Sequence, residues 1–183
     1  IVNPSIATKL FWDISTLMKF NGHIIIFISI FLGFWFDTII SSFDIRTHIL
    51  ILERAPYLME TCFGFLIFCY WIYAIPEKLQ SSSALLYGLL IDLCFGDAIG
   101  FHMLFFIATS YVIHVYALRF RLFSYFQLII FFAGAAVFYL ACKYLIFSPS
   151  NYSYLLLIFS FCINALAWLP IYFGMRYIRR RLI

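Results

Sequence analysis

The chain has 183 residues, of which 66% are hydrophobic, 22% are aromatic and 11% are charged, and its mean hydropathy is +1.03. So little polar surface cannot cover a water-exposed globule, which excludes a soluble domain and predicts that most of the chain lies in lipid. The net charge of +4 does not indicate nucleic-acid binding, because the C-terminal arginine cluster directly follows an apolar segment instead of forming a basic stripe.

Residues 1–22 precede the first long apolar run and are predicted to form an amphipathic helix on the membrane surface. Ile6, Leu10 and Ile14 share one face of this helix, and Lys9 lies opposite them. No short cleavable signal peptide is predicted, because the apolar run that follows is too long.

Six apolar segments are predicted to cross the membrane as helices, since about 20 residues span roughly 30 Å of hydrocarbon. The predicted fold is therefore an all-α, six-helix transmembrane bundle with a basic tail. One segment is short, so five spans with a re-entrant segment at residues 84–95 is the alternative. The predicted spans are about 23–43, 57–75, 79–96, 98–118, 124–147 and 152–175, and the tail is 176–183.

The distribution of lysine and arginine favours six spans with both termini in the cytoplasm. In this arrangement most basic residues are cytoplasmic, whereas five spans would move Lys9, Lys19 and Lys78 to the outside. The predicted cytoplasmic basic edge consists of Arg119, Arg121, Arg176, Arg179, Arg180 and Arg181.

A stripe of three glycines and one carboxylate lies within the third predicted span and its connection to the fourth. Gly88, Asp92, Gly96 and Gly100 are spaced four apart, which places them on one slowly drifting face of a helix. Glycines in such a stripe let another helix approach closely, and a carboxylate in an apolar segment must face protein, water or a partner. The stripe is therefore predicted to pack a helix, which we interpret as the transmembrane helix of a partner.

Five ionisable residues are expected at similar depth in the outer half of the membrane. Such residues usually face one another or a watery cavity, which predicts an outward-opening polar notch. The alternative is that the residues near the segment ends reach the headgroups individually. The residues are Asp37, Glu60, Asp92, His102 and Lys143.

No motif for catalysis, metal binding or a cofactor is present in the sequence, so the protein is predicted not to be an enzyme. The five cysteines lie within apolar runs and have no metal-ligand spacing. Asp92 and His102 form a carboxylate–imidazole pair if the turn between Gly96 and Gly100 folds back.

The stripe, read with elements before and after it, resembles the MreD family of bacterial rod-shape proteins. The resemblance runs from about Arg54 to Arg121, centres on YGLLIDLCFGDAIGFHML, and resumes in the last span and tail. This sequence departs from the family pattern where Ala55 separates Arg54 from Pro56 and where Leu169 separates Trp168 from Pro170. The supporting residues are Arg54, Pro56, Tyr70, Trp71, Pro76, Trp168 and Pro170.

The resemblance implies a non-catalytic scaffold of the bacterial inner membrane that acts in cell elongation and peptidoglycan synthesis. It implies a single-span MreC-like partner, with a RodA-like glycosyltransferase, a class B penicillin-binding protein and an MreB-like filament in the same machinery. It also implies a fold similar to the six-helix substrate-binding subunits of energy-coupling-factor transporters. The basic edge is then expected to meet anionic lipid or a cytoplasmic filament.

A second hypothesis comes from that similarity in fold. The chain is then the small-molecule-binding subunit of a vitamin or nutrient transporter, with Asp37, Asp92 and His102 contacting the ligand. A scaffold predicts neither a ligand retained through purification nor association with ATPases, and a transport subunit predicts both.

Overall fold

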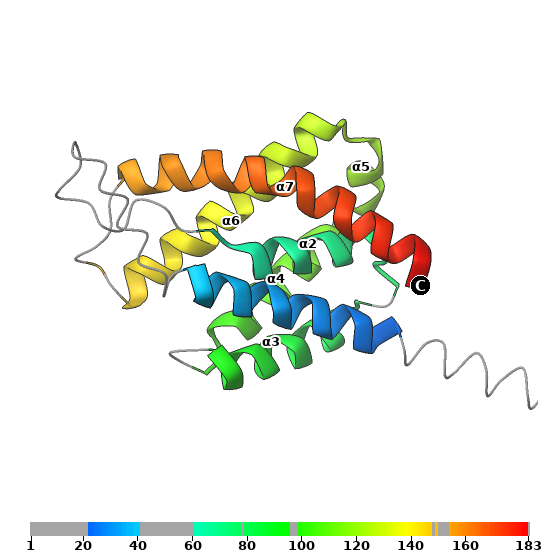
Figure 1. Ribbon diagram of the computed structural model, residues 1–183, viewed down its shortest axis with the longest axis horizontal. Helices are drawn as coiled ribbons and strands as arrows, with labels where there is room; N and C mark the ends of the chain where they lie inside the picture. Colours follow the sequence, from blue (N-terminus) through cyan, green and yellow to red (C-terminus); the bar gives the residue numbers. More distant parts are fainter. Residues whose placement is uncertain are drawn as a thin grey trace, which may run out of the picture.

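All regular structure in the described part of the chain is helical (Figure 1). The computed structural model describes residues 22–40, 61–77, 79–95, 99–147, 149 and 154–182. The surface helix predicted at residues 1–22 therefore lies outside the described residues, except for Gly22. The prediction of an all-α protein is confirmed for the described part.

Three helices are long and apolar enough to cross a membrane. They are the first helix, Gly22–Ile40, then α6, Tyr125–Phe147, and α7, Tyr154–Leu182. At a rise of about 1.5 Å per residue they are about 28, 35 and 43 Å long. The last helix continues through Pro170 and includes nearly all of the segment predicted as a basic tail.

Three further apolar helices are shorter than a full span. They are α2, Phe63–Ala74, then α3, Ser81–Phe95, and α4, Phe101–Val115. Their lengths of about 18 to 22 Å are less than the roughly 30 Å of a hydrocarbon core, so the number of spans stays a prediction. A short helix that the sequence did not predict, α5, Ala117–Leu122, follows α4 after a break at Tyr116.

The helices run back and forth between two ends of the molecule, which lie at the left and right of the view (Figure 1). One end holds the starts of α2 and α4, and we call it the cap end. The other holds Gly22, α5, the last residues of α2 and the C-terminal part of α7, and we call it the arginine end. The start of the first helix and the C-terminal end of α7 lie on the same side of the bundle (Figure 1).

Helix α2 lies at the centre of the bundle. Eight of its twelve residues are buried, and it packs against α4, α6 and α7. Aromatic rings fill the space around it: Phe68 stacks on Phe106 of α4 at 3.6 Å between centroids, and Phe65 stacks on Tyr139 of α6 at 4.9 Å. Around this centre, α3 pairs with α4, and α6 pairs with α7.

Candidate functional site

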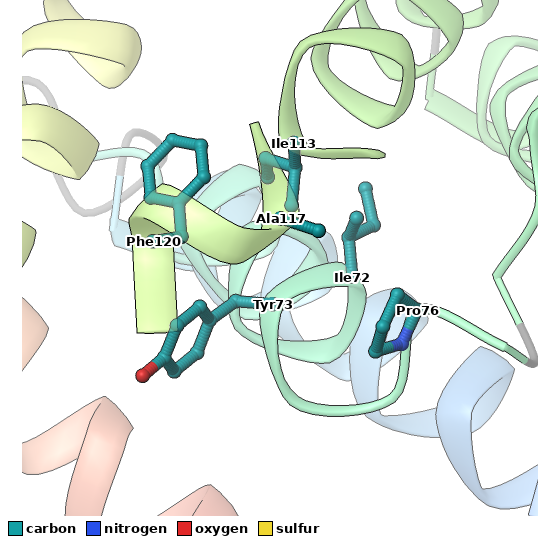
Figure 2. Close-up of a pocket in the computed structure, with 6 residues that line it drawn as sticks. All are labelled: Ile72, Tyr73, Pro76, Ile113, Ala117 and Phe120. Atoms are coloured by element: carbon teal, nitrogen blue, oxygen red, sulfur yellow. The ribbon is translucent and has the colours of Figure 1, made fainter. Parts of the chain in front are cut away.

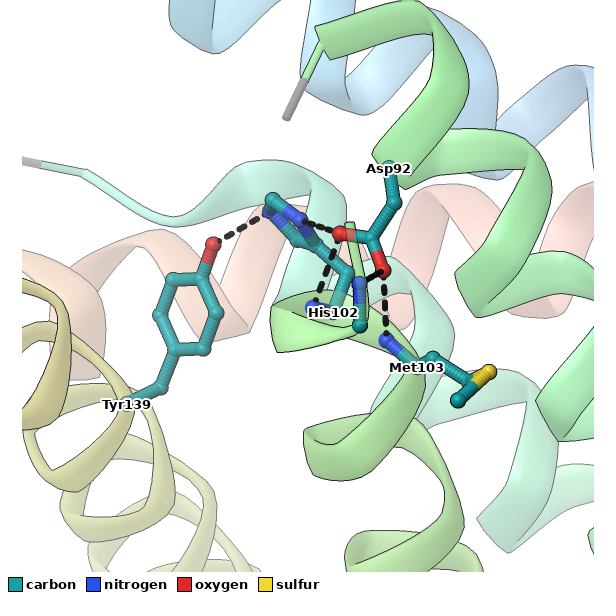
Figure 3. Close-up of polar contacts among 5 residues, drawn as sticks. Asp92, His102, Met103 and Tyr139 are labelled. Carbon is teal, nitrogen blue, oxygen red and sulfur yellow. Dashed lines mark hydrogen bonds and ion pairs between the residues drawn. The ribbon is translucent and has the colours of Figure 1, made fainter. Parts of the chain in front are cut away.

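Asp92 caps the N-terminus of α4 (Figure 3). Its side chain is fully buried near the end of α3. One carboxylate oxygen accepts from the backbone N–H groups of Gly100 at 2.8 Å and Met103 at 3.2 Å, and the other accepts from the N–H of His102 at 3.0 Å. The first N–H groups of a helix have no partner within the helix, and leaving them bare in an apolar interior costs free energy. Asp92 supplies those partners.

The same carboxylate holds the side chain of His102. The distance from Asp92 Oδ1 to His102 Nδ1 is 2.7 Å, and His102 Nε2 lies 2.7 Å from the hydroxyl oxygen of Tyr139 on α6. Because a carboxylate oxygen accepts here, Nδ1 carries the hydrogen, and the Tyr139 hydroxyl can donate to Nε2. The carboxylate–imidazole pair expected from the sequence is therefore present, and Tyr139 extends it to a third helix.

Two glycines of the predicted stripe have different structural roles. A side-chain carbon at Gly88 would lie 2.4 Å from the Cα of Met103, so α3 and α4 touch backbone to backbone there. Gly100, the N-cap residue of α4, has a φ of 106°, a conformation that favours glycine. The glycines thus let the chain turn and bring Asp92 onto the start of α4.

The stripe was predicted to contact another helix. In the structure, its described residues contact α4, a helix of the same chain. Gly88 and Asp92 face α4, and Gly96 lies outside the described residues. Contact of this stripe with a second protein stays a prediction.

Asp37 caps the N-terminus of α2 in the same way. Its carboxylate oxygens accept from the N–H groups of Phe63 and Gly64, each at 2.9 Å, and from the Thr61 hydroxyl at 3.3 Å. One turn earlier, a side-chain carbon at Gly33 would lie 2.8 Å from the Cα of Gly64. The first helix and α2 therefore also touch backbone to backbone.

A third polar residue completes the start of α2. The amide oxygen of Asn164 on α7 accepts from the N–H of Cys62 at 3.0 Å, while its amide nitrogen donates to the Ser160 carbonyl at 2.8 Å. This contact between Asn164 and the start of α2 was not predicted from the sequence.

The two caps are neighbours at the cap end. The ring of Phe34 meets His102 edge-on at 5.1 Å between centroids, and it also lies against Gly64 at the start of α2. Lys143, half-buried on α6, is close enough for its charge to act on Asp37. Of the predicted polar notch, Asp37, Asp92 and His102 are engaged with backbone and side chains of this chain, and Glu60 lies outside the described residues.

A small pocket lies at the other end of α2 (Figure 2). Its volume is about 10 Å³, roughly the room for one water molecule. None of the predicted notch residues lines it. The lining residues are Ile72, Tyr73, Pro76, Ile113, Ala117 and Phe120.

The residues that carry the resemblance in α2 and α7 have mainly packing roles. Trp71 donates to Ser29 of the first helix at 2.7 Å, and Tyr70 meets Tyr172 of α7 edge-on. Trp168 stacks on Phe132 of α6 at 4.2 Å between centroids. Arg54 and Pro56 lie outside the described residues.

The C-terminal end of α2 is also held by side chains. Arg179 of α7 donates to the Ala74 carbonyl at 3.1 Å, and His114 of α4 lies 2.9 Å from the Pro76 carbonyl oxygen. Both ends of this short, central helix are therefore bonded to other helices, which suits a helix that is buried in the bundle.

Within the described ranges, no three of His, Cys, Asp and Glu are arranged to bind a metal ion. The described residues define an all-helical bundle with three helices that are long and apolar enough to cross a membrane, in which buried polar side chains hold the ends of short helices. The family model of the rod shape-determining protein MreD matches residues 18–178. The chain belongs to this family, which assigns it to the determination of cell shape.

The comparisons with curated proteins and with solved structures found no match. Similarity to the substrate-binding subunits of energy-coupling-factor transporters therefore stays a prediction.

Proposed function

We propose that this protein is a non-catalytic scaffold of the bacterial elongation machinery that binds a single-span MreC-like protein and helps to organise peptidoglycan synthesis. The observation that carries the proposal is the family match over residues 18–178. The engagement of Asp92, His102 and Asp37 with the helix starts supports it, because these groups hold the fold together.

The α3–α4 pair is the proposed contact for the partner's transmembrane helix. Gly88 and Asp92 fix the geometry of this pair from inside. A rigid pair of short helices gives a partner one defined surface, which limits the conformational entropy lost on binding.

The proposal includes the rest of the elongation machinery and a location in the inner membrane. The RodA-like glycosyltransferase, the class B penicillin-binding protein and the MreB-like filament are its further proposed partners. The arginine end is proposed to face the cytoplasm, since cytoplasmic segments carry an excess of lysine and arginine.

The described residues give the transport-subunit alternative no support. Its expected ligand contacts, Asp37, Asp92 and His102, are bonded to this chain, and the pocket of about 10 Å³ is far smaller than the roughly 300 Å³ of a small-molecule site. The experiment below distinguishes the two functions.

The test is affinity purification of the full chain from its native membrane in mild detergent, with mass spectrometry of proteins and small molecules. The scaffold predicts recovery of a single-span, coiled-coil protein together with wall-synthesis enzymes. Recovery of paired ATPases or of a stoichiometric metabolite, without the single-span protein, would contradict it.

Two variants separate direct from indirect contact. Gly96→Leu is expected to leave the chain inserted and thermally stable but to abolish recovery of the partner. Gly88→Leu is expected to abolish recovery and also to lower the unfolding temperature, because the added side chain meets the Met103 backbone. Gly174→Leu is the control, since no atom lies within 4 Å of an added carbon there.

A further inference from the structure

The arginine end carries positive charge that no carboxylate balances among the described residues. Among the described residues, the contact between an acidic and a basic side chain is the one between Asp92 and His102, at the cap end. At the arginine end the described carboxylate is Glu77, which is exposed and forms no ion pair there. The arginines with described side chains are Arg119, Arg176, Arg179, Arg180 and Arg181.

Tyrosines accompany these arginines at the surface. The Arg119 guanidinium lies 5.6 Å from the ring centre of Tyr116, and that of Arg181 lies 4.8 Å from the ring centre of Tyr177. Arg176 points toward the hydroxyl of Tyr125, at 3.4 Å. Tyrosine and arginine side by side are typical of the headgroup layer of a membrane, where the ring lies among the acyl chains and the charge meets phosphate.

Helix α5 adds an apolar surface to the same end. Phe120 anchors this helix in the core with 3% of its surface exposed, whereas Leu118 and Leu122 are 79% and 85% exposed. Residues four apart lie on the same face of a helix, so both leucines point outward together. Arg119 of the same short helix is also exposed, so α5 carries both apolar and basic groups at the surface.

The length of α7 places its arginines at headgroup depth. This helix has 29 residues and is about 43 Å long, which exceeds a hydrocarbon core of roughly 30 Å by about two turns. Arg176, Arg180 and Arg181 are in its last two turns. When α7 starts at the opposite edge of the hydrocarbon core, this excess length carries the guanidinium groups to the level of the lipid phosphates.

We propose that the arginine end is a binding surface for anionic phospholipid, with Arg119, Arg176 and Arg180 binding the phosphate groups. The planar guanidinium donates two parallel hydrogen bonds to a phosphate, which an ammonium group does not. Leu118 and Leu122 insert among the acyl chains and set the depth of the surface. The exposed leucines favour a lipid leaflet over an acidic protein, because an acidic surface offers them no apolar contact. This proposal rests on the charge and exposure of this end alone, not on the proposed partners.

The test compares lipids retained by the full chain after release from mixed-lipid nanodiscs. The chain is incorporated into nanodiscs with equal amounts of phosphatidylglycerol and phosphatidylcholine, and native mass spectrometry counts the lipids that stay bound. The expected result is preferential retention of phosphatidylglycerol, weakened by salt.

The test variant is Arg119→Gln/Arg176→Gln/Arg180→Gln, which spares Arg179 because that residue holds the end of α2. The preference is expected to fall about fivefold for each arginine removed. The matched Arg→Lys triple variant keeps the charge and should lose only part of the preference, since it removes the paired hydrogen bonds. Lys143→Gln, a charge loss away from this end, should keep all of it.

Equal retention of the two lipids by the parental protein overturns the proposal, and this comparison does not depend on whether any variant folds. A preference that survives the triple glutamine substitution also overturns it, as does a preference that is the same at low and high salt. Failure here leaves the partner proposal untouched, because that proposal is tested by recovery of proteins.

Discussion

Asp37 and Asp92 have the same structural role at two places in the molecule, because each holds the start of a helix. Each lies four residues after a glycine, Gly33 or Gly88, and each glycine lets its helix touch the backbone at the start of the following helix. The carboxylate then accepts from the first N–H groups of that helix. The first helix with α2, and α3 with α4, are therefore two copies of one local design: a close contact followed one turn later by a cap.

The surroundings of the two caps differ. Asp92 is fully buried and is bonded to His102, which reaches Tyr139 on α6. Asp37 is partly exposed and has the Thr61 hydroxyl as its further donor. The comparison teaches that a glycine and a carboxylate one turn apart are enough to position a helix start. Burial and the additional partners determine how much stability depends on the carboxylate.

The largest expected effect is on the free energy of unfolding, and it differs between the two carboxylates. Asp92→Ala leaves three buried N–H groups and the His102 ring without an acceptor and should lower the free energy of unfolding by about 3 to 5 kcal/mol. Asp37→Ala should cost about 2 kcal/mol, because water can reach part of that site. Thermal unfolding followed by circular dichroism of the purified variants measures both. Equal losses would show that burial does not set the difference.

The next test concerns the glycines. Gly88→Ala should cost about 2 kcal/mol, because the added methyl group meets the Met103 backbone, which cannot move away cheaply. Gly33→Ala should cost a similar amount, since it meets the Gly64 backbone. Gly134→Ala is the matched control: an added carbon has open space there, so stability should stay the same or rise by up to about 1 kcal/mol. Losses in the control equal to those at Gly88 would remove the close contact as the cause.

A third test asks whether Tyr139 stabilises the Asp92–His102 network independently of the Asp37 site. Tyr139→Phe removes one hydroxyl from His102 and should cost about 1 kcal/mol. Its effect should add to that of Asp37→Ala, whose site it does not contact, but not to that of Asp92→Ala, which already disrupts the same network. Unfolding of the two double variants gives both coupling energies. Simple addition in both would mean that Tyr139 packs beside the network without stabilising it.

Part of this arrangement was predictable from the sequence. A single carboxylate among glycines in an apolar segment indicated that Asp92 faces protein, water or a partner, and a pair with His102 was considered only on the condition that the turn between them folds back. The equivalent Gly33 and Asp37 were missed as a pair because Asp37 lies near the end of its segment, where an interfacial position explains it equally well. The repeated spacing of glycine and aspartate was the signal that would have found them.

Other features depended on packing that no local pattern encodes. Tyr139 is one of 13 tyrosines, and nothing near it in the sequence indicates His102 as its partner. Asn164 reaches Cys62 across 102 positions of the chain. The end of α4 at Val115 and the separate α5 were not predicted because residues 98–118 are almost entirely apolar, and the burial of Phe120 is visible only in the structure.

The central claim, that each carboxylate holds the start of one helix, is tested most directly by hydrogen–deuterium exchange of the reconstituted protein. Peptides covering residues 100–103 and residues 63–66 report the two helix starts separately. Asp92→Ala should speed exchange in the first peptide more than in the second, and Asp37→Ala should do the reverse. Unchanged exchange at 100–103 in Asp92→Ala, or the same change in both peptides for both variants, would contradict the claim.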